Sequence, residues 1–301
     1  QPGGEGRAAC ELTQLRGGAD VSGLHDIFDF GIAFHKAMEH YHNFRAEGEI
    51  HDHAVRLALG TLVHTDQHYA RLPTHTDVEH LADETTEDDD GIQLRNTKVR
   101  TRYHLIRSVV WYLEHYANDE LTTIILPSGK AAVELSFRVP LPIYVGGREM
   151  LLTGHIDRAV ELNDRLCPVD YKTTKSLSKQ FFTDFELSHQ LTGYNIAGQV
   201  ILDRPTEGII IDGIALLVGG ATFQRSITKR SPGQVDEYFA TVQHIMAEAE
   251  SHAASGLYPQ NTSACYFCSF KELCSKPPEI RKSYERMLFD RKPAWNPLEN
   301  R

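Results

Sequence analysis

A short acidic hairpin near the middle of the chain limits the possible folds more than any other feature. Residues 151–159 and 166–173 are rich in aliphatic, β-branched and aromatic side chains, and the dipeptide Asn163-Asp164 between them is a turn signal. A two-residue turn at that point places Asp157 directly across from Asp170. Because like charges in opposed positions destabilise paired strands, the pattern predicts a compensating ligand, for which a divalent cation is the obvious candidate.

The same hairpin carries a lysine beside the two acids. Side chains alternate along a strand, so Lys172 falls on the same face as Asp170. Phosphodiester hydrolysis needs an activated water and neutralisation of charge on phosphorus, which Mg²⁺ or Mn²⁺ held by carboxylates supplies, and a lysine can orient the water. Asp157, Asp170 and Lys172 are therefore candidate residues of a nuclease site. A surface hairpin with solvated charges is the alternative, and such a short motif alone favours it.

Four of the five cysteines form a second candidate site. Cys265, Cys268 and Cys274 lie in the run CYFCSFKELC, and an odd count of cysteines without a secretion signal indicates a metal or cluster site rather than disulfides. Such sites usually take four ligands, and Cys10 is the natural fourth. One distant cysteine plus a triplet favours a 4Fe-4S cluster over a zinc ribbon, which generally uses two close pairs. We expect Cys167 to pack as a small apolar residue.

The periodicity of apolar residues predicts a mixture of helices and strands. We expect helices over residues 27–44, 52–69, 103–116, 186–202 and 234–254, and strands over 122–126, 132–141, 144–161, 166–173 and 208–220. A short corner or kink that contains Pro142 separates the second strand from the third. This order predicts an α+β or mixed α/β core with a helical N-terminal elaboration. The expected regions are a helical N-terminal region over 1–120, a core over 121–231, and a C-terminal helix with the cysteine module over 232–301.

Charge is distributed unevenly along the chain. The net charge of −10 argues mildly against a protein that coats nucleic acid by charge alone. An acidic run over residues 83–90 is followed by Arg95, Lys98, Arg100, Arg102 and Arg107, and a second basic group contains Arg225, Lys229 and Arg230. Solvated faces are one interpretation of these groups, and a groove that grips a phosphate backbone is the other.

Neither a membrane span nor a signal peptide is evident. No apolar run approaches the about 20 residues that a membrane helix requires, and the first residues, QPGGEGRAAC, lack an apolar h-region. We therefore expect a cytoplasmic, intracellular protein without a membrane partner.

Six pieces of the sequence, taken in order, resemble the RecB-like branch of the PD-(D/E)XK nucleases, which includes AddB-like and CRISPR-associated members with a 4Fe-4S cluster. The pieces are Cys10, GIAFH with His35, GHID with Asp157, VDYK with Asp170 and Lys172, QLTGY with Gln190 and Tyr194, and the triplet Cys265, Cys268 and Cys274. They stand in the order of the family and extend along nearly the whole chain.

The resemblance implies a fold and a set of roles. The fold is a restriction-endonuclease-like core, in which a central mixed sheet is flanked by helices, followed by the C-terminal iron-sulfur module. Gln190 and Tyr194, one helical turn apart, would position the substrate beside the metal. Glu134 in VELSF resembles a position seen in relatives, but we do not include it in the site. The implied metal ligands are His35, Asp157, Asp170 and the backbone carbonyl of Tyr171.

These features together predict a Mg²⁺- or Mn²⁺-dependent deoxyribonuclease. We expect an exonuclease that acts on single-stranded DNA or duplex ends, with the cluster as a structural clasp. The second interpretation is a nuclease-like adaptor subunit that holds DNA or a partner nuclease in a recombination or CRISPR-adaptation complex. The complete set of Asp157, Asp170 and Lys172 favours the enzyme. The candidate protein partners are a second copy of the chain and a recombination or CRISPR-adaptation protein.

Overall fold

The computed structural model describes residues 11–14, 22–74, 99–268 and 270–292. The chain divides into two compact units, which we call the central unit and the terminal unit. The central unit spans residues 22–244, and the terminal unit combines residues 1–21 with 245–301. The sequence-based boundaries after residues 120 and 231 remain a prediction.

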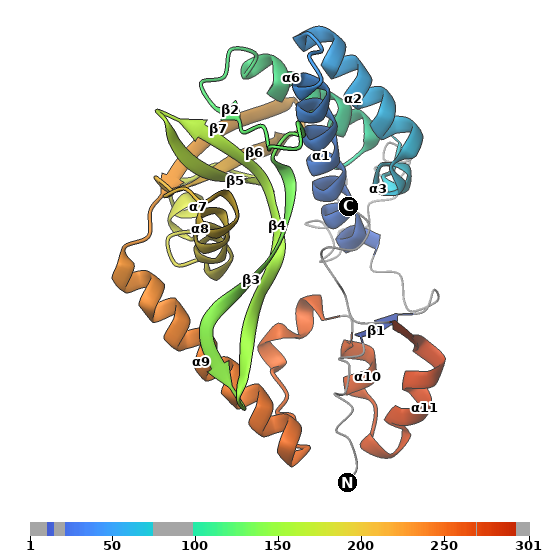
Figure 1. Ribbon diagram of the computed structural model, residues 1–301. Helices are drawn as coiled ribbons and strands as arrows, with labels where there is room; N and C mark the ends of the chain where they lie inside the picture. The colour runs from blue at the N-terminus through green and yellow to red at the C-terminus, as the bar shows by residue number, and fades with distance from the viewer. Residues whose placement is uncertain (1–10, 15–21, 75–98, 269, 293–301) are drawn as a thin grey trace. The chain divides into compact units, whose positions relative to one another are not determined.

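A mixed sheet of six strands forms the middle of the central unit (Figure 1). β4 pairs with three strands, β2, β3 and β5, and the sheet continues from β5 to β6 and β7. Only β5 and β6 run parallel, and all the other pairs are antiparallel. The strands are β2 (Thr122–Thr123), β3 (Val133–Val145), β4 (Arg148–Leu162), β5 (Arg165–Thr174), β6 (Ile209–Leu217) and β7 (Gly220–Thr228).

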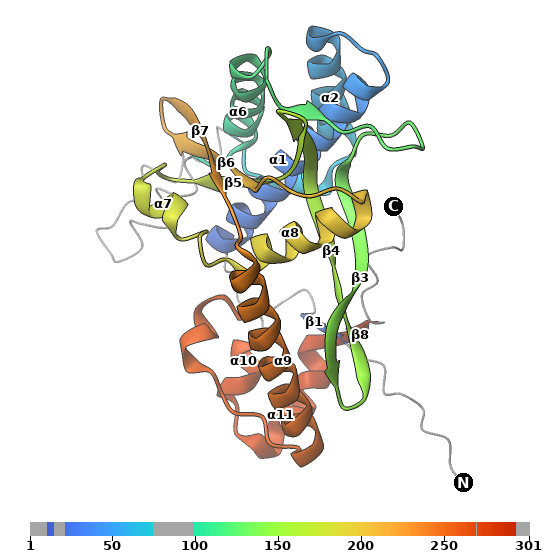
Figure 2. The same cartoon turned by 60° about the vertical axis from the view of Figure 1, so that its left-hand side comes forward.

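Helices cover both faces of this sheet. Figure 1 shows α1 and α2 on one side and α7 and α8 on the other, and Figure 2 shows α8 lying across its face. Phe34 and Tyr112 pack against Tyr171 on the first side, while Leu191 packs with Ile156 on the second. The predicted mixed sheet flanked by helices is confirmed. The helices are α1 (Ser22–Ala46), α2 (His51–Thr65), α3 (Gln67–Arg71), α6 (Arg102–His115), α7 (Lys179–Thr183) and α8 (His189–Leu202).

Side-chain caps determine where several helices begin. The hydroxyl of Ser188 accepts a hydrogen bond from the backbone N–H of Leu191, so α8 begins at His189 rather than at residue 186 as expected. Thr101 caps α6 in the same way by accepting from His104. These caps place the first turns of α6 and α8 at fixed positions relative to the sheet.

The acidic hairpin has the predicted register. Both residues of the Asn163-Asp164 turn have positive φ, 51° and 60°, as a two-residue turn of type I′ requires. The paired residues of β4 and β5 follow this turn as far as Arg158↔Val169, where the described ladder ends. Asp157 and Asp170 are the next opposed positions, so they lie where the two strands begin to separate.

The strand boundary predicted at Pro142 is wrong, whereas a kink at this place agrees with the irregular pairing of β3 and β4 there. β3 continues to Val145 and turns back at Gly146-Gly147, whose φ values of 57° and 75° suit a tight hairpin. Within the described residues β3 pairs with β4 alone, so Pro142 lies on an edge strand, where a missing N–H costs little. A register shift between Pro140 and Tyr144 absorbs the local irregularity.

The single strand predicted over residues 208–220 is also wrong. β6 ends at Leu217, and β7 runs back from Gly220 as its antiparallel neighbour. The dipeptide Gly219-Gly220 therefore belongs to a hairpin rather than to the end of the sheet. As a consequence, Arg225 lies inside a strand instead of following one.

Arg225 compensates a buried acid in this hairpin. Asp212 on β6 has no exposed surface, and its Oδ2 accepts hydrogen bonds from the Tyr112 hydroxyl and from Arg225 Nε at 2.7 Å. Arg225 also donates to both carboxylate oxygens of Asp119, at 2.6 and 3.0 Å. Its guanidinium lies 3.5 Å from the centre of the Tyr116 ring. The charge of Arg225 is thus engaged within the fold rather than presented to a phosphate.

Removing Arg225 should destabilise the central unit strongly. Arg225→Ala leaves the Asp212 carboxylate buried without its cation, so we expect the free energy of unfolding to fall by about 3–5 kcal/mol. Urea titration followed by circular dichroism measures this loss. As a matched control, Arg204→Ala removes a half-exposed ion pair with Glu161 and should cost less than about 1 kcal/mol. Equal losses in the two variants would contradict the assignment.

The terminal unit joins segments from both ends of the chain. β1 (Glu11–Gln14) pairs antiparallel with β8 (Phe289–Lys292). Phe289 stacks on Phe270 with ring centres 5.1 Å apart, and this contact ties β8 to the cysteine segment. No helix among the described residues combines the length and the apolar content needed to cross a bilayer. The helices ahead of β8 are α9 (Pro232–Ser255), which begins in the central unit, η1 (Thr262–Phe267), α10 (Lys271–Ser275) and α11 (Pro278–Leu288).

Candidate active site

The two acids and the lysine of the hairpin come together where β4 and β5 separate. Asp157 Oδ2 accepts a hydrogen bond from the backbone N–H of Tyr171 at 2.8 Å. Lys172 Nζ lies 3.0 Å from Asp170 Oδ1 and 2.8 Å from Oδ2. The side chain of Asp170 is almost fully buried, whereas that of Lys172 is 27% exposed. The partly exposed amine of Lys172 is therefore held by the buried carboxylate of Asp170.

His35 reaches this site from α1. Its Nε2–H donates to the backbone carbonyl of Tyr171 at 3.0 Å, and its Nδ1 lies 3.5 Å from Asp157 Oδ2. The ring of Tyr171 packs edge-on against Phe34, and its hydroxyl lies 3.3 Å from His42 Nε2. His35 and His42 are two helical turns apart, so α1 contacts Tyr171 at both its backbone and its side chain.

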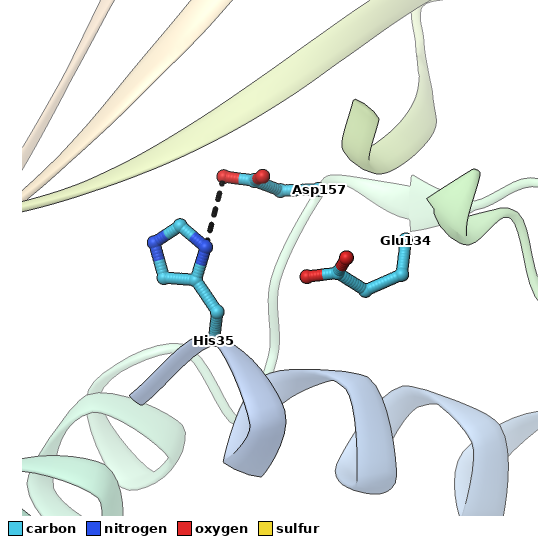
Figure 3. Close-up of side chains that lie close together, drawn as sticks. All are labelled: His35, Glu134 and Asp157. Carbon is cyan, nitrogen blue, oxygen red and sulfur yellow. Dashed lines mark ion pairs between the residues drawn. The ribbon is translucent and has the colours of Figure 1, made fainter. Parts of the chain in front are cut away.

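Glu134 completes a group of three metal-ligating side chains. Ligand atoms of His35, Glu134 and Asp157 all lie within 4.8 Å of one another (Figure 3). Glu134 lies in β3 with a positive φ of 45°, which interrupts the regular alternation of side chains along the strand. The predicted site omits Glu134, although its position resembles one seen in relatives, and the positive φ that turns it toward His35 leaves no mark in the periodicity. Glu134 lies in β3, which pairs with the strand that carries Asp157, and this neighbouring position could have indicated that Glu134 belongs to the site.

The carboxylates dominate the electrostatics of the site. Burial alone would lower the pKa of His35, but Asp157, with Asp170 and Glu134, outweighs it and raises the pKa to about 9. Burial likewise opposes ionisation of Asp157, yet His35, the Tyr171 amide and Lys172 together lower the pKa of its carboxyl. Burial and the nearby Asp157 raise the pKa of Asp170 to about 6. The raised pKa values of His35 and Asp170 indicate an excess of negative charge at the site.

Gln190 and Tyr194 connect α8 to the lysine. Gln190 Oε1 accepts a hydrogen bond from Lys172 Nζ at 3.2 Å, and Gln190 Nε2 donates to the Tyr194 hydroxyl at 3.0 Å. Burial raises the pKa of Tyr194, and Asp157 and Asp170 raise it further, so the hydroxyl stays protonated. The pair therefore contacts the amine directly, in addition to any contact with substrate.

The cysteine triplet occupies consecutive turns of the terminal unit. The N–H of Cys268 donates to the Cys265 carbonyl at 3.4 Å, and the N–H of Cys274 donates to the Phe270 carbonyl at 2.9 Å. All three thiols are free, and those of Cys268 and Cys274 are exposed. Cys10 lies outside the described residues. Cys167 is fully buried in the core, which confirms its expected packing role.

The mixed sheet carries an acid on β4 opposite an acid and a lysine on β5. Comparison with known families identifies the class of protein to which this arrangement belongs. The sequence model of the PD-(D/E)XK nuclease superfamily matches residues 11–275, most of the chain. The protein belongs to this superfamily. A similar solved structure, described as "Crystal structure of SSO0001", is 13% identical, with coverage of 66% of this chain and 93% of that one and a TM-score of 0.33. No curated protein matches the chain at a significant level.

The residues present suit the divalent metals that this superfamily uses. Carboxylates and backbone carbonyls are ligands for Mg²⁺ and Mn²⁺, and imidazole is accepted by Mn²⁺. The group of His35, Glu134 and Asp157 offers three such ligands, and the Tyr171 carbonyl adjoins it. A bound cation would also offset the excess negative charge of the pocket.

Mn²⁺ should therefore stabilise the folded protein. At a free Mn²⁺ concentration tenfold above its dissociation constant, binding should add about 1.4 kcal/mol to the free energy of unfolding. Scanning calorimetry with and without Mn²⁺ measures the shift, and Asp157→Asn should remove most of it. Asp164→Asn, at the exposed hairpin turn, is the matched control and should keep the shift. An undiminished Mn²⁺ effect in Asp157→Asn would argue against this site.

Proposed function

We propose that the protein is a Mg²⁺- or Mn²⁺-dependent deoxyribonuclease that works as an exonuclease on single-stranded DNA or duplex ends. The observation that carries this proposal is the convergence of Asp157, Asp170 and Lys172 with His35 at the separation of β4 and β5. The preference for DNA ends is supported by the resemblance to RecB-like nucleases. Membership of the nuclease superfamily supports DNA as the substrate class.

The residues of the site divide into metal ligands and groups that act on substrate. His35, Asp157, Asp170 and the Tyr171 carbonyl would hold the ion, and Glu134 adjoins this set. A divalent ion bound there neutralises charge on the scissile phosphate and lowers the pKa of a bound water.

Lys172 would contribute through the position of its amine. Asp170 and Gln190 hold Nζ from two sides, which fixes its direction while leaving it partly exposed. A fixed ammonium can orient the attacking water and stabilise charge that develops on the phosphate oxygens. Tyr194 supports this arrangement, because its hydroxyl accepts from the Gln190 amide nitrogen and so leaves Oε1 facing the lysine.

We further propose that Cys10, Cys265, Cys268 and Cys274 hold a 4Fe-4S cluster that clasps the terminal unit. Pairing of β1 with β8 brings Glu11, the neighbour of Cys10, into the unit that contains the triplet. None of the three described thiols is in a disulfide and two of them are exposed, which supports their role as ligands. A cluster of this kind would act on the stability of the unit and on DNA binding before it affected the chemistry.

Nuclease activity should depend on the site residues. Oligonucleotides labelled at the 5′ or 3′ end, single-stranded and duplex, should be digested with Mg²⁺ or Mn²⁺, and Lys172→Ala or Asp157→Ala should lower kcat by about 10²–10³-fold. Lys175→Ala changes an exposed lysine just beyond the site and serves as the control with ordinary activity. The labels also give the direction of digestion. DNA binding without cleavage by metal-loaded protein would identify an adaptor subunit instead.

The visible absorption spectrum of the purified protein tests the proposed cluster. Protein purified without oxygen should be brown, with broad visible absorbance that is lost in Cys268→Ser and kept in Cys167→Ala. Colourless protein that contains zinc would contradict the cluster. The clasp is tested separately: a folded variant that lacks all three C-terminal cysteines should bind DNA more weakly, and full binding would exclude that role.

A further inference from the structure

The outer face of α6 carries a row of two aromatic rings with a cation between them. Tyr103, Arg107 and Trp111 are spaced by four residues, so they share one face of the helix. Tyr103 is 51% exposed and Trp111 is 42% exposed. The Arg107 guanidinium carbon lies 5.4 Å from the centre of the Tyr103 ring and 5.1 Å from that of Trp111. We call these three residues the α6 ladder.

The ladder is fixed to the end of the β6–β7 hairpin. Arg107 Nη2 lies 3.2 Å from the backbone carbonyls of both Leu217 and Val218 and donates to them. Trp111 lies against Gly220, where an added Cβ would be 3.0 Å from Trp111 Cζ3, so the glycine permits this approach. The side chains of the ladder are thus held in place before any ligand arrives, and ordering them on binding costs little entropy. Figure 2 shows α6 beside this end of the hairpin.

The charge of Arg107 is not neutralised within the described residues. Among the described residues, both of its hydrogen bonds are to neutral carbonyls, and its Nε has no hydrogen-bond partner. Arg225, by contrast, contacts the carboxylates of both Asp119 and Asp212. The ladder therefore offers a positive charge and two exposed rings to a ligand that is both anionic and aromatic.

The ladder and the candidate active site both lie toward the carboxyl ends of β5 and β6. β5 and β6 are parallel, and Lys172 is paired with Gly213. Leu217 and Val218 lie four and five residues farther along β6, which corresponds to about 15 Å in the strand direction at ~3.3 Å per residue.

We propose that the α6 ladder binds a single-stranded segment of the DNA substrate, with bases stacked on Tyr103 and Trp111 and a backbone phosphate at Arg107. This inference rests on the proposed nuclease function, since it concerns how that enzyme holds its substrate. Stacking on aromatic side chains requires exposed base faces, which a single strand offers and a duplex covers. The cation between the rings matches the repeating charge of the backbone, so the observations favour a nucleic acid strand over an apolar protein segment.

Binding can be measured without cleavage in a Lys172→Ala background. Fluorescence anisotropy of labelled oligo(dT) should show the dissociation constant rising about tenfold on Trp111→Ala or Tyr103→Ala, while Trp111→Phe keeps most of the affinity. Tyr144→Ala removes an exposed tyrosine at the β3–β4 hairpin and is the matched control. A duplex of the same length should be affected much less. Unchanged oligo(dT) affinity in both alanine variants would overturn the proposal.

A second measurement does not depend on altering the ladder. The chain has two tryptophans, so Trp295→Phe leaves Trp111 as the sole indole. Adding oligo(dT) should quench its fluorescence with the same dissociation constant that anisotropy gives, and absence of quenching at saturating oligo(dT) would overturn the proposal. The two hypotheses fail differently. Ladder binding without any metal-dependent cleavage would reject the nuclease, whereas cleavage by a protein whose Trp111 is not quenched would reject the ladder.

Discussion

The hydrogen bond from the Tyr171 amide to the Asp157 carboxylate is the interaction on which the site depends. β4 and β5 pair regularly up to Arg158↔Val169, and beyond that point a side chain takes the place of a backbone acceptor. The strands can therefore separate without leaving the amide unsatisfied. The gap that opens exposes the Tyr171 carbonyl to His35 and gives two opposed acids room for a ligand.

The central unit contains two pairs of buried or partly buried acids whose charges are compensated in different ways. Asp212 and Asp119 are bridged by Arg225, whose guanidinium donates to both, and Arg158 lies 3.6 Å from Asp119, so two acids face two arginines and the network serves the fold. Asp157 and Asp170 have a histidine and a partly exposed lysine instead, and their surroundings raise the pKa of His35 to about 9. Buried charge that is compensated within the chain supports structure, whereas charge left in excess attracts a cation.

Sequence reasoning succeeded where local rules act alone. The Asn163-Asp164 turn and strict alternation fix the register of β4 and β5, and these are properties of a few neighbouring residues. Prediction from the sequence failed where contacts between distant parts of the chain determine the local structure. Pro142 reads as a break only if β3 is not an edge strand, and Glu134 turns toward His35 through a positive φ that no periodicity reveals. The predicted start of α8 at residue 186 differs from the observed start at His189, because periodicity alone does not reveal that Ser188 caps the helix.

The pairing of β1 with β8 has a consequence for the order of assembly in the cell. Chains emerge from the ribosome N-terminus first, and compact units fold as they appear. Among the described strands, residues 11–14 pair only with residues 289–292, which are made after the sheet built from residues 122–228 is complete. The central unit can thus form well before the unit that unites the ends. A chain whose synthesis ends before residue 289 would have its central sheet folded and residues 11–14 without their β8 partner, open to proteases.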